Sequence, residues 1–213
     1  MSQQLQLGKP APDFCADTTQ GQVCLKDLRG KWVLFFSHPG DFTPICTTEF
    51  VEFAKRYQDF SKRGVFLIGL SIDTVFSHIS WTRNIKEKFG VDIPFPIIGD
   101  PEGKVARAFG MIPEGKRETV RAVLLIDPPD GNIAWMAYYP YTNGRNIDEI
   151  IRVIDAIQTT YKYGGVSTPA NWRPGDPVVI PAPKTKEEVE ARLKDPSVEC
   201  KDWYICFKRM EIK

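Results

Sequence analysis

The sequence predicts an α/β fold, in which helices cover both faces of a central mixed sheet and an extended C-terminal arm follows. Three observations support this fold class. Short apolar runs rich in aromatic and branched residues indicate buried strands, segments with apolar residues at three- and four-residue steps indicate amphipathic helices, and the two kinds of segment alternate along most of the chain.

The first half of the chain predicts two strand-helix units. The run 32–37 (WVLFFS) is apolar throughout, as in a strand that is buried on both faces, and it stops at His38-Pro39-Gly40. In the segment that follows, apolar residues recur with the period of a helix until Gly64. The expected elements are strands at 32–37, 65–71 and 96–98 and helices at 47–63 and 78–89.

The next segment predicts a hairpin and a helix. Strands at 121–127 and 133–139 are joined through Pro128-Pro129-Asp130-Gly131, whose Asp-Gly pair tolerates positive φ angles. A helix is expected at 147–161. This order of elements is that of a thioredoxin-like mixed sheet flanked by helices.

After Gly164-Gly165 the composition changes. Repeated prolines interrupt any periodicity, and only 184–194 has the pattern of a short charged helix. We therefore expect one domain over residues 1–165 and an arm over residues 166–213. An arm without its own core would pack its rings on a neighbouring subunit. These rings are Trp172, Trp203, Tyr204 and Phe207.

Charge and hydropathy exclude several classes of partner. The 28 Lys and Arg residues nearly balance 27 Asp and Glu residues, without the basic stripe that nucleic-acid binding requires. No apolar stretch approaches the roughly 20 residues that span a bilayer, and residues 1–9 do not resemble a secretion leader. We expect a soluble, cytoplasmic protein that binds neither nucleic acid nor membrane.

The five cysteines are an odd number, which argues against a framework of structural disulfides. Cys15 and Cys24 lie in alternating, strand-like stretches, and we expect them to serve as packing residues. The chain has two histidines, and no two cysteines have the spacing usual in zinc sites, so no metal and no other cofactor is expected. His78 lies in a helical pattern and is expected to be structural.

Cys46 has a different setting, because it follows a buried strand and a loop with two prolines and begins a helix. Free backbone N–H groups and the helix dipole favour a thiolate there. Full ionisation raises the thiolate fraction at pH 7 by only ~30-fold over that of an ordinary cysteine. A fast reaction at sulfur therefore needs further groups.

Four residues are candidates for these groups. Thr43 offers a hydroxyl and a backbone N–H. Arg121 places a charge at the start of a buried strand, where it requires a partner, and we assign it to the thiolate and to the bound peroxide. Pro39 is expected to shield the pocket from water. Glu49, one turn into the helix, is expected to orient Arg121 by a bidentate pair.

The pattern Pro39-x-x-x-Thr43-x-x-Cys46, with Arg121 far downstream, resembles the active site of the peroxiredoxins. Segments 35–39, 94–98 and 121–123 are similar to the one-cysteine subfamily, and the cysteine-rich C-terminus resembles archaeal members. This resemblance implies reduction of hydrogen peroxide and alkyl hydroperoxides, oxidation of Cys46 to a sulfenic acid, a thiol reductant such as a thioredoxin-like protein, and decameric rings of five dimers. For His38, a backbone hydrogen bond and a contact with the oxidised sulfur both stay open.

Cys200 and Cys206 depart from the one-cysteine pattern. Their Cα atoms would lie about 20 Å apart in a strand and about 9 Å apart in a helix, whereas a disulfide needs less than about 7 Å. They can pair only if the chain bends back. We hypothesise that one of them forms a disulfide with the oxidised Cys46 and that the other then enters this disulfide by thiol–disulfide exchange. Resemblance to archaeal enzymes implies Cys206 of another subunit, and the alternative is that both are spare thiols.

Other activities fit less well. A thioredoxin-type dithiol oxidoreductase needs Cys-x-x-Cys, and a cysteine phosphatase needs an arginine six residues after the nucleophile, but positions 49 and 52 are both glutamate. The Gly-x-Ser-x-Gly motif expected for a phospholipase is absent from the sequence. A holdase role for rings with exposed aromatic arms is retained as a second activity.

Overall fold

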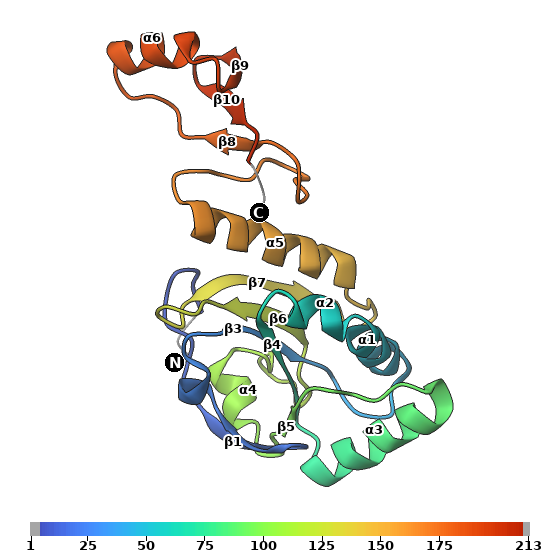
Figure 1. Ribbon diagram of the computed structural model, residues 1–213. Helices are drawn as coiled ribbons and strands as arrows, with labels where there is room; N and C mark the ends of the chain where they lie inside the picture. The colour runs from blue at the N-terminus through green and yellow to red at the C-terminus, as the bar shows by residue number, and fades with distance from the viewer. Residues whose placement is uncertain (1–4, 211–213) are drawn as a thin grey trace. The chain divides into compact units, whose positions relative to one another are not determined.

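The computed structural model describes residues 5–210, shown in Figure 1. Residues 1–4, within the segment judged not to be a leader, and residues 211–213, at the end of the expected arm, lie outside the described residues. The chain forms two compact units, Met1–Ile147 and Asp148–Lys213. The division into a domain of residues 1–165 and an arm of residues 166–213 stays a prediction. None of the described helices is long and apolar enough to cross a membrane.

The first unit is built on a seven-stranded mixed sheet, which confirms the predicted fold class. Its strands lie in the order β2-β1-β5-β4-β3-β6-β7. Strands β3, β4 and β5 are parallel, and β6 runs antiparallel to β3. The strands are β1 (Cys15–Thr18), β2 (Gly21–Cys24), β3 (Trp32–Ser37), β4 (Val65–Ser71), β5 (Ile97–Gly99), β6 (Arg121–Ile126) and β7 (Ile133–Tyr139).

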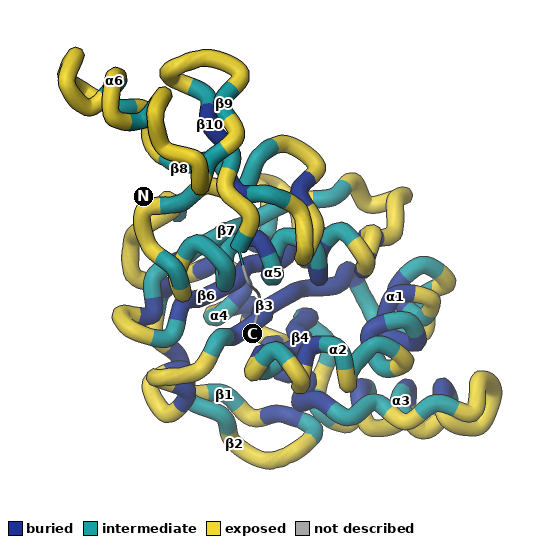
Figure 2. Tube along the Cα trace, turned by 45° about the horizontal axis from the view of Figure 1, so that its top comes forward, coloured by how far each residue is buried: buried dark blue, intermediate teal, exposed yellow. Residues whose placement is uncertain are grey.

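Strand β3 is buried on both faces, as its continuous apolar run predicts. Phe35 packs against Phe14 and Phe109 on one face of the sheet. Phe36 stacks on Phe53 on the other. Figure 2 shows buried residues concentrated in the central strands.

Helices lie on both sides of this sheet (Figure 1). The expected helix 47–63 is broken near Arg56, whose φ and ψ of −94° and 7° are not helical. The helix also begins earlier than expected, at Pro44, and this places Cys46 inside its first turn. The helices of this unit are η1 (Leu25–Leu28), α1 (Pro44–Lys55), α2 (Tyr57–Ser61), α3 (Val75–Phe89) and α4 (Lys104–Ala108).

The hairpin between β6 and β7 is confirmed. The Asp127 side chain accepts hydrogen bonds from the backbone N–H groups of Asp130 and Asn132, and Gly131 adopts the positive φ of 69° that the turn requires. The turn brings β7 alongside β6 and aligns Arg121 with Tyr139 at the far end.

The second unit contains more structure than an arm without a core. It consists of α5 (Ile147–Tyr163), β8 (Val178–Ile180), α6 (Lys186–Lys194), β9 (Glu199–Asp202) and β10 (Ile205–Lys208), with a sheet in the order β8-β10-β9. Trp172 was expected to pack on another subunit. Instead its ring is buried with Ala156 and Val178, and its Nε1 donates to the carbonyl of Asp176, because this unit has a small apolar core.

The expectation that Cys15 and Cys24 are packing residues is wrong. They form a disulfide, because β1 and β2 form a hairpin whose register places the two residues directly opposite each other. Cys15 is exposed. The odd cysteine count was therefore misleading: all five cysteines lie in the described part of the chain, and two disulfides leave a single free thiol there, that of Cys46.

Candidate active site

Cys46 lies in the first turn of α1, and its side chain is fully buried. Thr43 is the N-cap residue in an extended conformation, and Pro44 at the first helical position needs no hydrogen-bond acceptor for its nitrogen. The sulfur therefore lies close to the free N–H groups at the positive end of the helix dipole. Negative charge that develops on this sulfur is stabilised by these groups.

Arg121 is the first residue of β6, and its guanidinium lies beside this sulfur. Its Nη1 is 3.3 Å from Cys46 Sγ and 2.8 Å from Glu49 Oε2. Its Nε donates to the carbonyl oxygen of Tyr141 at 3.0 Å. Arg121 is only 1% exposed, so the interaction between its charge and a thiolate is weakly screened by solvent.

Glu49 joins two arginines. It was expected to form a bidentate pair with Arg121, but Arg121 makes a single hydrogen bond to it. The bidentate pair is with Arg145, whose Nε lies 2.8 Å from Oε1 and whose Nη2 lies 2.7 Å from Oε2. Arg145 Nη1 also donates to the carbonyl oxygens of Ser37 and Ala122. Arg145 therefore connects α1 to β3 and β6.

The pKa of Glu49 is lowered from its ordinary value. Burial acts to raise the pKa, but the charge and hydrogen bonds of Arg145, together with the charge of Arg121, outweigh burial. Glu49 is thus a carboxylate that holds the same Arg121 nitrogen, Nη1, that contacts the sulfur. No sequence pattern pointed to Arg145, which lies in a polar loop far from Cys46 along the chain. The available clue was that a buried carboxylate needs cationic partners.

Pro39 and Thr43 belong to the loop between β3 and α1. Pro39 is buried, and Thr43 Oγ1 donates to the carbonyl oxygen of Gly40 at 2.9 Å. The carbonyl oxygen of Thr43 accepts bonds from the N–H and hydroxyl of Thr47. The Thr43 hydroxyl is thus held by the loop and keeps its lone pairs free to accept a hydrogen bond.

His38 is fully buried at the end of β3. Its Nε2 lies 2.9 Å from Asp41 Oδ1, and its ring stacks on Trp81. Within the described residues no hydrogen bond joins the ring to Cys46, and Nδ1 has no partner. Of the two alternatives for His38, a backbone partner for the ring is not found, and a contact with oxidised sulfur stays a prediction.

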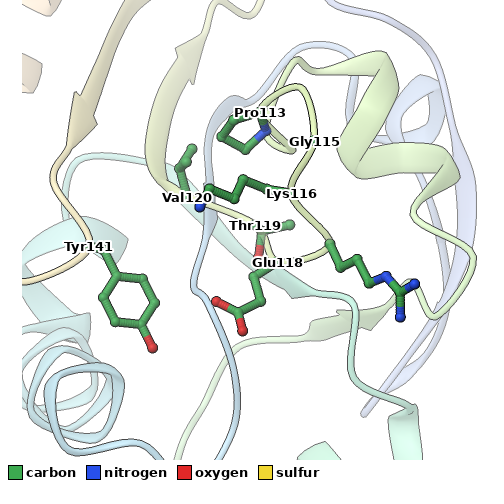
Figure 3. Close-up of a pocket in the computed structure, with 8 residues that line it drawn as sticks. Pro113, Gly115, Lys116, Glu118, Thr119, Val120 and Tyr141 are labelled. Atoms are coloured by element: carbon green, nitrogen blue, oxygen red, sulfur yellow. The ribbon is translucent and has the colours of Figure 1, made fainter.

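A pocket of about 450 Å³ lies at the start of β6, where Val120 precedes Arg121. It is lined by the loop around Lys116 and Glu118, by Val120 and by Tyr141. Figure 3 shows the Tyr141 ring on one side of the pocket and the loop residues on the other. The Tyr141 carbonyl also accepts a hydrogen bond from Arg121, and the Tyr141 ring lies 5.8 Å from that guanidinium, so Tyr141 connects the pocket lining to Arg121.

Cys200 and Cys206 are paired with each other. The chain bends back through Trp203 and Tyr204, so that β9 and β10 form a hairpin and the Cα atoms of the two cysteines are 4.0 Å apart. Cys206 is buried, whereas Trp203 and Tyr204 at the turn are exposed. The bend that pairing requires is therefore present.

The geometry of the first unit defines a class of protein: a thioredoxin-like sheet that presents a buried free cysteine at a helix start, next to an arginine held by a glutamate. Comparison with known proteins identifies the family. Residues 7–136 match the AhpC/TSA family, and residues 156–195 match the C-terminal domain of 1-Cys peroxiredoxin.

Similar proteins carry the same family name. A peroxiredoxin of Thermoplasma volcanium is 55% identical over 201 residues, which cover 94% of this chain and 97% of the relative. Peroxiredoxin 2 of Thermoplasma acidophilum is 53% identical over 201 residues, with coverage of 94% and 99%.

Solved structures agree. A yeast mitochondrial 1-Cys peroxiredoxin superimposes with a TM-score of 0.87 at 42% identity, covering 97% of this chain and all of that one. Peroxiredoxin 6 of Arenicola marina gives 0.86 at 37% identity, covering 98% and 100%. The chain therefore belongs to the peroxiredoxins, which are antioxidant peroxidases, and its fold is that of the one-cysteine members.

Proposed function

We propose that this peroxiredoxin reduces hydrogen peroxide and organic hydroperoxides with Cys46 as the nucleophile. The observation that carries the proposal is the 3.3 Å distance between Arg121 Nη1 and Cys46 Sγ, with both side chains buried. A cation held at this distance stabilises a thiolate in a site from which water is largely excluded.

In the chemical step the Cys46 thiolate attacks the terminal oxygen of the peroxide. The sulfur electron pair forms the S–O bond, the O–O bond breaks, and its electrons leave with the second oxygen, which takes up a proton to give water or an alcohol. Sulfur is oxidised to the sulfenic acid and the peroxide is reduced.

Arg121 and Thr43 accelerate this step. Negative charge moves from sulfur to the leaving oxygen, and the fixed guanidinium of Arg121 interacts with both atoms. Thr43 Oγ1 accepts the hydrogen bond of a bound hydroperoxide, and this bond orients the terminal oxygen toward sulfur. Pro39 keeps water out of the pocket, and Glu49 fixes the guanidinium.

The sulfenic acid is then resolved by the C-terminal cysteines. The Cys206 thiol of another subunit forms a disulfide with Cys46 and releases water. The Cys200 thiolate next attacks Cys206, frees the Cys46 thiolate and leaves the Cys200–Cys206 disulfide. The hairpin that holds these two cysteines in register supports this final product.

Resolution requires a local opening of the site. Cys46 is 0% exposed, so its sulfur cannot meet the thiol of another chain while the first turn of α1 is intact. Unwinding this turn breaks the bond from Thr47 N–H to the Thr43 carbonyl and turns the sulfur outward. A dithiol protein of the thioredoxin kind then reduces the Cys200–Cys206 disulfide. The yeast structure concerns thiol resolution by glutathione and thioredoxin systems, which supports a thiol reductant.

We also propose a decamer made of five dimers, in the cytoplasm. An apolar surface supports self-association: Phe76 is 82% exposed, Phe42 is 55% exposed, and with Ile79 they line a groove of about 700 Å³. Light scattering of Phe76→Lys should give a smaller assembly than the parent protein. Phe89→Lys, at the end of the same helix and outside the groove, is the control, and equal masses for all three proteins would contradict this interface.

Peroxide consumption tests the proposal. Reduced protein mixed with substoichiometric peroxide should lose thiols, and Cys46→Ser should abolish the rapid loss. If Cys46→Ser consumes peroxide as fast as the parent, the proposed nucleophile is wrong. Non-reducing gels test resolution. After peroxide, Cys200→Ser should retain the Cys46–Cys206 disulfide as a covalent dimer, and this dimer should be absent when Cys206→Ser is added. Its persistence in that double variant would exclude Cys206.

A further inference from the structure

Three buried side chains, one of them in the loop between β3 and α1, form a cluster that does not take part directly in the reaction at Cys46. Asp41 lies between His38 and His78. His38 Nε2 is 2.9 Å from Asp41 Oδ1, and His78 Nδ1 is 2.8 Å from Asp41 Oδ2. The side chains of the two histidines are 0% exposed and that of Asp41 is 1% exposed.

The hydrogen-bond partners of His78 determine its protonation. Its Nδ1 faces the Asp41 carboxylate, and its Nε2 lies 3.1 Å from the carbonyl oxygen of Ile98. Both partners are acceptors, so both ring nitrogens must carry a proton. His78 is therefore an imidazolium, paired with a buried carboxylate.

The hydrogen-bond partners of His38 indicate a neutral ring. Its Nε2 must donate to Asp41, whereas Nδ1 has no partner and is the unprotonated nitrogen. Burial lowers the pKa of His38 despite the opposing effect of Asp41, which agrees with a neutral ring. Burial acts to raise the pKa of Asp41, but the two histidines outweigh it and hold that pKa far below its ordinary value.

A metal ion fits this cluster less well than protons. Ligand atoms on a tetrahedral zinc stand roughly 3.3 Å apart for bonds of about 2.0–2.1 Å. The N···O distances here are 2.8 and 2.9 Å, which are hydrogen-bond lengths. Metal-bound histidines also donate their second N–H group, and His38 Nδ1 has no acceptor among the described residues.

The cluster holds the loop that carries Pro39 and Thr43. Asp41 is fixed by its side chain and by its backbone N–H, which donates to Asp73 Oδ2 at 3.0 Å. The adjacent Gly40 carbonyl accepts the Thr43 hydroxyl. Between these anchors Phe42 adopts a φ of 55°, a strained conformation for an aromatic residue that persists only where the surroundings enforce it.

We infer that His78 is a positioning residue: as a buried imidazolium it fixes Asp41, the tautomer of His38 and the conformation of the loop that presents Thr43 to the peroxide. The positioning role rests on the proposed function of Cys46. The protonation states inferred for His38 and His78 are independent of that proposed function.

Nitrogen NMR of the full-length protein tests the protonation pattern. His38 and His78 are the two histidines of the chain, so 15N-histidine labelling gives four ring nitrogens. Solid-state spectra at neutral pH should show one ring protonated at both nitrogens and one neutral ring protonated at Nε2. Two neutral rings would overturn the inference, as would stoichiometric zinc in the purified protein. This readout needs no variant and no activity.

Variants test the positioning role. Asp41→Asn removes the negative charge and replaces one acceptor oxygen by an NH2 group. His78 should then lose its second proton, and the rate of Cys46 oxidation by peroxide should fall roughly 10- to 100-fold. His78→Gln should lower this rate similarly. Lys88→Ala, at an exposed position of the same helix α3 and outside the groove, should match the parent. Thermal melts identify variants that fail to fold.

The outcomes separate the inference from the proposed function. Folded variants that oxidise as fast as the parent would contradict the positioning role. Slow oxidation of the parent itself would contradict the proposed function, and the nitrogen spectrum would still decide the state of His78.

Discussion

Arg145 donates hydrogen bonds to both carboxylate oxygens of Glu49, and the pair is almost fully buried, with side-chain exposures of 0% and 2%. Arg121 is held by a single bond to the same carboxylate, so the position of the reactive cation depends on a second arginine.

Replacing Arg145 by lysine should therefore lower both stability and rate. Lysine keeps the charge but cannot reproduce the bidentate contact or both carbonyl contacts, so the free energy of unfolding should fall by about 1–3 kcal/mol. Stopped-flow oxidation of Cys46 should slow by roughly 10-fold or more as Arg121 loses its fixed position. Arg152→Lys is a matched control, because Arg152 forms the same bidentate contact with the partly exposed Glu149. Equal losses of unfolding free energy and of oxidation rate in the two variants would contradict the special role of Arg145.

Glu49 should make stability depend on pH. Its folded pKa lies below the ordinary value of 4.5, so its contribution to the free energy of unfolding is present above that value and is lost as pH falls through the lower folded pKa. Denaturant titrations from pH 7 to pH 3 should show a steeper acid loss for the parent than for Glu49→Gln. Glu102→Gln, which alters an exposed pair with Lys104, should keep the parental slope. Parallel curves for parent and Glu49→Gln would exclude this linkage.

Tyr141 should affect large peroxides more than small ones. Its ring forms one wall of the pocket at the start of β6, while its backbone carbonyl holds Arg121, so Tyr141→Ala removes the wall and keeps the anchor. The KM for an aromatic hydroperoxide should rise about 3- to 10-fold, from the loss of roughly 1 kcal/mol of apolar contact, with little change for hydrogen peroxide. Tyr138→Ala removes another exposed ring that does not line the pocket and serves as the control. Equal changes for both peroxides would show that the pocket does not bind the organic group.

The Cys15–Cys24 disulfide should stabilise the fold without taking part in turnover. The two cysteines are separated by nine positions in the sequence, and their disulfide joins β1 to β2. Its removal in the double variant Cys15→Ser/Cys24→Ser should lower the free energy of unfolding by about 2–3 kcal/mol. The initial rate of peroxide reduction should be unchanged. A strong reductant opens both disulfides, so parent and variant should unfold alike when both are measured in reductant. A slower peroxide reaction in the variant would contradict a purely structural role.

Local patterns predicted much of the fold. The buried run of β3, the hairpin at Asp130-Gly131 and the helix near Cys46 depend on residues close in sequence, and the structure contains all three. The break near Arg56 and the short helix α4 were not predicted, because a few residues of helical period carry little signal. The small core around Trp172 was missed for another reason: its members are far apart in the sequence.

The sequence by itself determined the candidate active site: a cysteine at a helix start after a buried strand, with Thr43 nearby and a buried Arg121 in need of a partner. Such features follow from local periodicity and from the cost of burying a charge. Only the tertiary structure decided that Arg145 holds Glu49, that Cys15 pairs with Cys24, and that Asp41 lies between His38 and His78. Each of these depends on which distant segments lie within hydrogen-bonding or covalent distance, and sheet register and loop conformation set those distances.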